Sequence, residues 1–166
     1  MKPAPIPAND AERLDALRRL LILDTPPEER FDRIVNFAAE EFDMPMAQLS
    51  LVDEHRQWFK ARVGMSLCQT ARAESFCGHV VELTEGLVVE DATLDERFFD
   101  NPLVTGEPYV RFYAGAPLVL PCGNIVGALC VLDRRPRTFD AMDRAILHSL
   151  RDLAMTELLS SECNAA

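Results

Sequence analysis

The cysteines and histidines are the side chains of this sequence with the greatest capacity for chemistry. There are five cysteines and three histidines among 166 residues. No two cysteines are spaced as Cys-x-x-Cys and the histidines are far apart, so the spacing typical of a zinc site is absent and we predict no metal. In a reducing compartment the cysteines are expected to be free thiols. The chemistry to consider is therefore that of individual thiols.

Cys77 is the strongest candidate because of its place in the sequence Ser-Phe-Cys-Gly-His. Ser75 is a favourable N-cap residue, which predicts a short helix over residues 76–83 with Cys77 in its first turn. Free amides and the helix dipole at that position favour a thiolate. The alternative is an unreactive buried cysteine, which is the more frequent situation. His79 points to another side of this helix and is a poor partner for Cys77. A histidine can also be an axial ligand of haem, but a single histidine is weak evidence for a haem site.

Two further segments offer groups for a ligand. In residues 91–101 the simplest interpretation is that Asp91 or Asp95 caps a turn and Phe98 fills the core. Arg111 begins an apolar strand, where alternation places it on the same face as Tyr113. There it offers a cation for a carboxylate or phosphate, or forms an ion pair with an aspartate of residues 91–101. The candidate ligand-binding residues are Cys77, His79, Asp91, Phe98, Arg111 and Tyr113.

These candidates are positioned by two apolar segments that we predict to form a central antiparallel hairpin. Residues 112–120 and 125–132 are β-prone, and a Pro-Cys-Gly-Asn link separates them. Both are apolar almost throughout, so we expect layers on both faces of the pair. Residues 47–53 and 57–63 predict an outer hairpin, and residues 87–90 a short strand. The result is an α+β domain with a sheet of five or six antiparallel strands.

Three longer helices are predicted from capping residues and apolar periodicity. Asn9 belongs to a capping-box pattern at the start of the first helix. Thr25 predicts the start of a second helix that ends before Pro45. Thr138 is expected to cap a last helix that extends to about Ser160. The apolar strip of this last helix either covers the sheet or pairs with a second copy of the chain.

Composition and charge restrict the classes of partner. With 48% hydrophobic residues and a formal net charge of −10, the sequence predicts one acidic domain over residues 9–160, with a loose leader (1–8) and a tail (161–166). An acidic surface disfavours nucleic acid and anionic membranes, because phosphates are neutralised by Lys and Arg. The sequence has neither the apolar run of a membrane helix nor the apolar core of a signal peptide, so we expect a cytoplasmic protein.

Five segments resemble, in order, the GAF domain found in bacterial sensor histidine kinases and diguanylate cyclases. They are ILDTPPEERFD, LVDEHRQWFKARVG, ESFCGHVV, DATLDERFFDNPLVTG, and RFYAGAPL followed by GALCVLD, and they span about Leu14 to Leu159. The resemblance implies a GAF fold with the terminal helices on one face of the sheet. A roof formed by residues 65–106 would cover the other face, with a pocket between roof and sheet.

The function implied by this resemblance is sensory or regulatory rather than enzymatic. A small molecule, or a change in redox state at Cys77, would alter the roof or the pocket. The terminal helices of a homodimer would then pass the change to an output domain, such as a kinase or cyclase, in cis or in trans. The sequence identifies neither the ligand nor a cofactor.

Two alternatives remain open. Cys68 and Cys77 resemble two cysteines of the free methionine-(R)-sulfoxide reductases, which are single-domain GAF enzymes, but residues 91–111 lack the further cysteine that does their chemistry. The other alternative is a ligand-free dimerisation module with a solidly packed roof. A covalent bilin is disfavoured because glycine rather than histidine follows Cys77, and a cyclic nucleotide because residues 95–101 lack the Asn-Lys-Phe-Asp-Glu motif.

Overall fold

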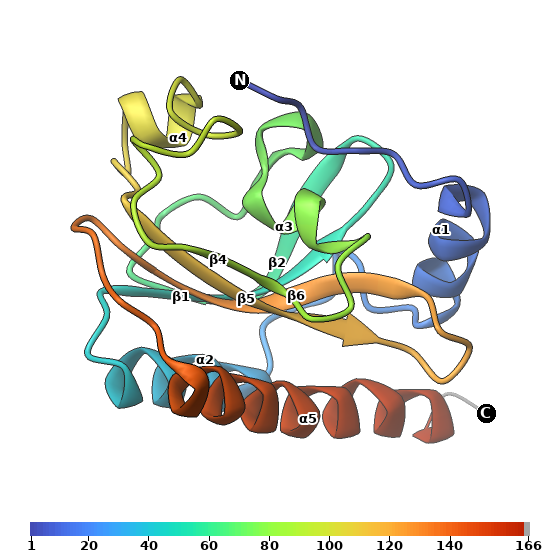
Figure 1. Cartoon of the computed structure of the whole chain (residues 1–166). Helices are drawn as coiled ribbons and strands as arrows, with labels where there is room; N and C mark the ends of the chain where they lie inside the picture. Colours follow the sequence, from blue (N-terminus) through green and yellow to red (C-terminus); the bar gives the residue numbers. More distant parts are fainter. Residues whose placement is uncertain (165–166) are drawn as a thin grey trace.

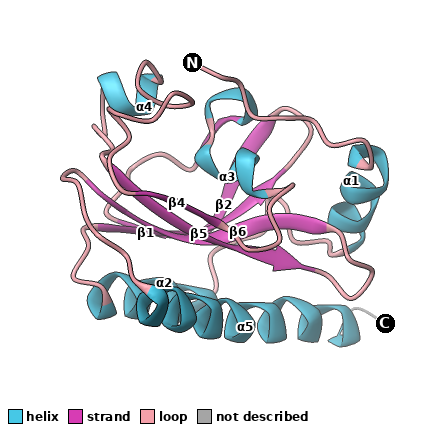
Figure 2. Cartoon of the chain, in the orientation of Figure 1, coloured by secondary structure: helices cyan, strands magenta, loops and turns pink. Residues whose placement is uncertain are grey.

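The chain forms three layers in the computed structural model, which describes residues 1–164 (Figure 1). A six-stranded antiparallel sheet lies in the middle. Two long helices cover one face of the sheet, and short helices and loops form a roof over the other (Figure 2). The predicted α+β class and the arrangement of layers are confirmed.

The strands are β1 (Met46–Val52), β2 (Arg56–Val63), β3 (Gln69–Ala71), β4 (Leu87–Val89), β5 (Phe112–Val119) and β6 (Ile125–Asp133). They are arranged in the sheet in the order β3-β2-β1-β6-β5-β4.

The helices are α1 (Asp10–Arg19), α2 (Glu29–Glu41), α3 (Phe76–Val80), α4 (Pro102–Thr105) and α5 (Ala141–Asn164), with a 3₁₀ turn η1 (Arg72–Glu74). The last helix, α5, extends four residues further than predicted, and residues 165 and 166 of the predicted tail lie outside the described residues.

The hairpin predicted at the outside of the sheet reaches its centre. β1 pairs with β2 on one side and with β6 on the other, and all seven of its residues are buried. The edge beyond β2 is closed by β3, a short strand that the sequence analysis did not predict. The hairpin of β5 and β6 forms as predicted, with β4 as the other edge. β1 takes the central place because both of its faces are buried.

Alternate side chains of the β5–β6 hairpin enter two separate cores. Phe112 and Leu129 pack on the side of α2 and α5, whereas Tyr113 and Cys130 pack under the roof. All nine residues of β6 are buried, as are most of those of β5. Neither face can therefore be exposed to water, and the two covering layers follow from this pair of strands.

The second long helix begins later than predicted because a buried lysine binds the segment before it. Lys60 donates to Thr25 Oγ1 at 2.7 Å and to the carbonyl oxygen of Pro26 at 2.6 Å. Its ammonium also lies 2.7 Å from the carboxylate of Glu28, and its side chain is fully buried. A buried charge requires such partners. The hydroxyl of Thr25 thus accepts a hydrogen bond from Lys60 and does not cap the helix, and α2 begins at Glu29.

Two other predicted caps are also wrong. The side chain of Asn9 makes no capping bond and instead donates to Asn124 Oδ1 at 3.0 Å. This contact places α1 at the end of the sheet beside the β5–β6 turn, apart from α2 and α5 (Figure 1). At the start of α5 the backbone amides and carboxylates of Asp140 and Asp143 exchange hydrogen bonds of 2.8 and 3.0 Å. This pair, rather than Thr138, sets the start of the helix.

The predicted loose leader, residues 1–8, lies across the roof (Figure 1). The backbone amide of Lys2 donates to the carbonyl oxygen of Arg97 at 3.2 Å, and that of Ala4 donates to Ala73 at 3.0 Å. Ala4 is buried. The segment is therefore a packed part of the roof layer.

Gly127 in β6 is a position at which the sheet has no room for a side chain. A Cβ atom there would overlap the carbonyl oxygen of Ser50 and lie 3.0 Å from the Cα atom of Leu51 in β1. These are backbone atoms of a central strand, so Gly127→Ala should lower the free energy of unfolding by about 3 kcal/mol, measured by urea denaturation.

Gly106→Ala is the matched control for this prediction. Its added Cβ atom would meet one neighbour, the carbonyl oxygen of Pro102 at 3.2 Å. We expect it to cost less than about 1 kcal/mol, as for most surface changes. Equal losses in the two variants would contradict the assigned pairing of β1 with β6.

Candidate functional site

A small cavity lies between the sheet and the roof. Its volume is about 10 Å³, enough for about one water molecule. Its walls come from five of the strands, from α3 and α4, and from the loops that follow β2 and α4; only β4 contributes nothing among the strands described. Its polar lining consists of Gln48, Gln57, Thr70, Cys77 and Tyr113. We call this space the inner cavity.

Cys77 sits at the centre of the groups around this cavity. The hydroxyl of Ser75 accepts from the backbone amide of Gly78 at 3.0 Å, which confirms the predicted cap and places Cys77 in the first turn of α3. The thiol is buried, 3.0 Å from the hydroxyl of Tyr113 and 3.7 Å from the sulfur of Cys130. The structure thus joins two predicted site residues, Cys77 and Tyr113, and adds Cys130 to them.

The two thiols differ in acidity. Burial opposes a thiolate at Cys77, but hydrogen bonds with Cys130 and Tyr113 outweigh burial and hold the pKa of Cys77 below its ordinary value. Burial raises the pKa of Cys130 well above its ordinary value, and the neighbouring Cys77 adds to the rise. Burial likewise raises the pKa of Tyr113. Cys77 is therefore the group that loses its proton first, while Tyr113 and Cys130 keep theirs.

Two glutamines at the cavity were missed by the sequence analysis. Gln48 Oε1 lies 3.6 Å from the sulfur of Cys130 and 3.5 Å from the hydroxyl of Ser50. Gln57 Nε2 donates to the hydroxyl of Thr70 at 3.0 Å. Gln57 Oε1, however, is buried and has no hydrogen-bond partner within the described chain. The available signal was a glutamine within each of two otherwise buried strands, since such a side chain needs polar neighbours.

Phe98 and His79 belong to an aromatic cluster behind the cavity. The ring of Phe76 stacks on Phe98 and on Tyr113, with centroid distances of 4.1 and 5.1 Å. His79 meets the ring of Phe98 at 4.9 Å in an edge-on arrangement. Burial, with the charge of Arg97, lowers the pKa of His79, so its ring is neutral at pH 7. These rings fill much of the space expected for a pocket under the roof.

Asp91 and Arg111 do not line the inner cavity. Asp91 Oδ1 accepts from the backbone amide of Thr93 at 3.0 Å and from its hydroxyl at 2.6 Å, which is the turn cap that its position predicts. Arg111 donates to the carbonyl oxygens of Val104 at 2.8 Å and Val110 at 3.1 Å. It thereby holds α4, a helix that the sequence analysis did not predict, against the start of β5.

A larger cleft adjoins the inner cavity on the outside. Its volume is about 420 Å³, a size that suits a small organic molecule. The segment 64–67 forms one wall, and Glu107, Pro108 and Arg134 form the other. Met65 and Pro108 line both spaces and therefore separate them. We call this space the outer cleft.

Comparison with known proteins establishes the family. The sequence profile of the GAF domain matches residues 26–158. The chain belongs to the GAF family. A cyclic di-GMP phosphodiesterase of Pseudomonas aeruginosa is 41% identical to this GAF domain over 160 residues, which are 95% of the chain and 27% of that protein. The chain thus spans about a quarter of the length of this relative.

Solved structures confirm the GAF fold. The GAF domain of an Acinetobacter phosphoenolpyruvate-protein phosphotransferase superposes with a TM-score of 0.69 at 23% identity, covering 92% of this chain and 95% of that one. A domain of a Sinorhizobium meliloti two-component sensor histidine kinase protein gives a TM-score of 0.64 at 15% identity, covering 83% and 94%. Within residues 1–164, no helix has the length and apolar character needed to cross a membrane.

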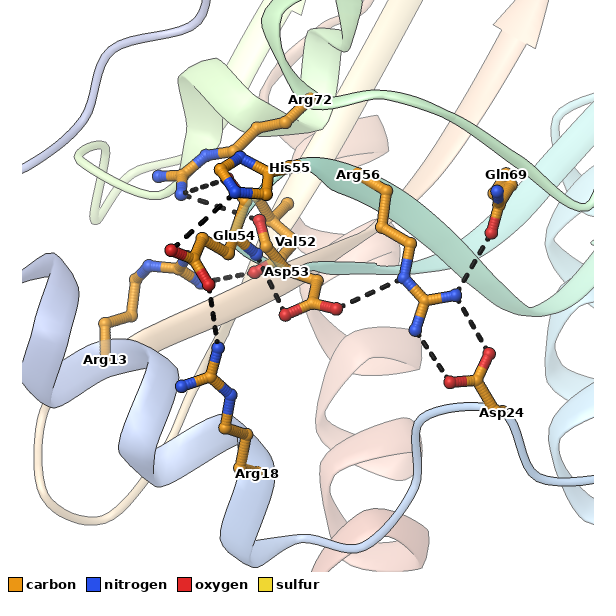
Figure 3. Close-up of polar contacts among 10 residues, drawn as sticks. All are labelled: Arg13, Arg18, Asp24, Val52, Asp53, Glu54, His55, Arg56, Gln69 and Arg72. Carbon is orange, nitrogen blue, oxygen red and sulfur yellow. Dashed lines mark hydrogen bonds and ion pairs between the residues drawn. The ribbon is translucent and has the colours of Figure 1, made fainter.

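A second polar cluster of this GAF domain attaches α1 to the turn between β1 and β2 (Figure 3). Arg13 is completely buried; it donates to Asp10 at 2.8 Å and to the carbonyl oxygen of Val52 at 2.7 Å. Arg72 donates to both carboxylate oxygens of Asp10, at 2.8 and 2.9 Å. One carboxylate thus compensates two buried guanidinium groups. We call Asp10, Arg13 and Arg72 the buried ion cluster.

Further ion pairs lie beside Arg13 and Arg72, the two arginines of the buried ion cluster, in Figure 3. Arg56 lies 2.8 Å from Asp24 and 3.1 Å from Asp53, and Arg18 lies 3.1 Å from Glu54. The pair of Arg18 on α1 with Glu54 is exposed and contributes little to stability because water screens it, and the pairs of the part-buried Arg56 do not involve α1. The attachment of α1 therefore depends mainly on the buried ion cluster.

Removal of the shared carboxylate should destabilise the domain in a pH-dependent way. Hydrogen bonds from Arg72, against the effect of burial, and from Arg13 lower the pKa of Asp10. The stability that this group contributes is present above about pH 4 and is lost as the pH falls through the lowered pKa. Asp10→Asn should therefore lower the free energy of unfolding by about 3 kcal/mol at pH 7, and by less at lower pH.

The measurement is urea denaturation of both proteins from neutral to acidic pH. Asp15→Asn is the control, because Asp15 pairs on the surface of α1 with Arg19 at 3.2 Å and should cost less than about 0.5 kcal/mol. A difference between wild type and Asp10→Asn that stays constant below pH 4 would show that the carboxylate is not held in its ionised form.

Proposed function

We propose that this GAF domain senses a small molecule in the cytoplasm for a bacterial signalling protein. The observation that carries the proposal is that Gln57, a residue that lines the inner cavity, has a buried carbonyl oxygen with no hydrogen-bond partner within the described chain. A buried acceptor without a partner costs about 1–3 kcal/mol. A ligand that donates a hydrogen bond to Gln57 recovers this free energy and stabilises the conformation that binds it.

The sizes of the two spaces indicate how such a ligand binds. The inner cavity holds about one water molecule, whereas the outer cleft is large enough for an organic molecule. Met65 separates them on a partly exposed loop, and a methionine side chain adapts readily to a new neighbour. We infer a ligand whose body occupies the outer cleft and whose N–H or O–H group passes Met65 to reach Gln57.

Binding should depend on Gln57 and can be measured by native mass spectrometry. The protein is incubated with the small-molecule fraction of a bacterial extract, and the native mass is compared with the denatured mass. Wild type should retain the mass of a small organic molecule. Gln57→Leu should bind it about tenfold more weakly, since the loss of one buried hydrogen bond is worth more than 1 kcal/mol.

Gln69→Leu is the matched control for this change. Gln69 is exposed on β3, and its carbonyl oxygen accepts from Arg56 at 3.1 Å outside the cavity. Its loss should leave binding unchanged. A wild-type protein that retains no molecule from the extract, or equal binding by Gln57→Leu, would argue against the ligand site.

We also propose that the signal passes to the helices through the sheet and that two copies meet at those helices. α2 and α5 lie on the face of the sheet opposite the roof (Figure 1). Large apolar side chains on both helices are exposed, among them Phe37, Met142 and Leu153. A second copy would bury them. A phosphodiesterase or kinase output domain, in the same chain or another, would then respond to the helix positions.

The dimer predicts a large effect of a charge in the exposed strip. Leu153 of α5 is 56% exposed. Leu153→Glu would bury a carboxylate in the interface and should weaken the dimer by about 100-fold, as measured by sedimentation equilibrium. Leu94→Glu is the control, since Leu94 is 81% exposed on the roof side. A wild-type protein that is monomeric at tens of micromolar would contradict the interface.

A further inference from the structure

We propose that Cys77 and Cys130 form a reversible disulfide when hydrogen peroxide enters the inner cavity, and that this bond ties the roof to the centre of the sheet. The inference adds a second input to the domain and does not depend on the organic ligand proposed above. It uses Cys130, which the sequence analysis did not single out, because the structure places Cys130 next to Cys77.

The positions of the sulfur atoms carry the proposal. They are 3.7 Å apart, and both thiols are buried. A disulfide requires a separation of about 2.05 Å, so a small shift brings them to bonding distance. The shift can come from the roof, because Cys77 lies in a five-residue helix whereas Cys130 lies in a central strand.

The inner cavity selects the oxidant by size and polarity. Cys77 lines the cavity, whose volume of about 10 Å³ excludes glutathione and other organic disulfides. Hydrogen peroxide is only slightly larger than water and, like water, donates and accepts hydrogen bonds. Gln57, Thr70 and Tyr113 line this space and supply polar side chains around it, and the carbonyl oxygen of Gln57 has no other partner within the described chain.

The reaction balances with peroxide as the oxidant. The thiolate of Cys77 attacks one oxygen atom, the O–O bond breaks, and a sulfenic acid forms on Cys77 while the departing hydroxide takes a proton to give water. The sulfur of Cys130 then attacks the sulfur of Cys77, the S–O bond breaks, and the proton of Cys130 leaves with the second hydroxide as water. Two thiols lose two electrons, and one peroxide becomes two waters.

The local environment assigns these roles to the two cysteines. Cys77 is the nucleophile because it lines the cavity, whereas Cys130 does not, and because its hydrogen bonds favour the thiolate; Cys130, 3.7 Å away, is the resolving thiol. The disulfide would remove the contact between the Cys77 thiol and the hydroxyl of Tyr113. It would also fix α3 to β6, so that the roof no longer moves independently of the sheet.

The test uses a protein that retains only the two cysteines of interest. The native protein is treated with hydrogen peroxide, the peroxide is removed, and the protein is then unfolded in urea so that remaining thiols are alkylated, with or without prior dithiothreitol, before intact mass and peptide mass are measured. The expected result is the loss of two hydrogen atoms, a cross-linked peptide that contains both residues, and full reversal by dithiothreitol. The three cysteines changed to serine in this background are Cys68, Cys122 and Cys163.

Cys130→Ser in the same background separates the two steps. It should yield no cross-link and should instead gain one oxygen atom on Cys77, which dimedone traps once the peroxide is removed and the protein is unfolded in urea. Peptide mapping of the wild-type chain repeats the measurement without relying on the fold of a variant. The proposal is overturned if Cys77 and Cys130 both remain free under conditions that oxidise the exposed Cys68, or if they cross-link only in urea. Neither outcome bears on ligand binding, which is measured on the reduced protein.

Discussion

Two adjacent strands that are apolar on both faces impose the layers of this domain. Because β5 and β6 expose no face to water, one side must be covered by α2 and α5 and the other by the roof. The same strands then connect the two layers, since Phe112 touches the helix side and its neighbour Tyr113 the roof side. A shift of Tyr113 under the roof would therefore be passed to the helix side through the adjacent residue, Phe112.

This architecture could be predicted from the sequence because the signals for its strands, turns and helices are local. Apolar runs, a Pro-Gly turn and the Ser75 cap all act over a few residues. The errors arose where distant residues compete for a local signal. Thr25 has the pattern of a cap, but the buried ammonium of Lys60 binds it instead. The strand β3, likewise, exists only through its pairing with β2. Such partners cannot be read from spacing.

The same distinction applies to the site. Cys77 and Tyr113 were found because a helix start and a strand alternation place them under the roof. Gln57 and Cys130 were not singled out, because their neighbours come from the packing of separate strands and helices. Arg111 was placed on the correct strand, yet its partners are backbone carbonyls that no sequence pattern marks.

The packing around α3, including residues 1–8, bears on why glycine follows cysteine in the Cys77-Gly78 pair. A Cβ atom on Gly78 would lie 2.5 Å from the hydroxyl oxygen of Ser75, 2.6 Å from the Cβ atom of Ala4 and 3.1 Å from the carbonyl oxygen of Arg72. The glycine is thus required both by the serine that caps α3 and by the segment that crosses the roof, and not by the thiol beside it. During evolution, a relative that loses this segment would still need glycine at that position for as long as it keeps the serine cap, whether or not it keeps the cysteine. A sequence motif shared by related proteins can therefore reflect the packing around its glycine rather than the chemistry of the neighbouring cysteine.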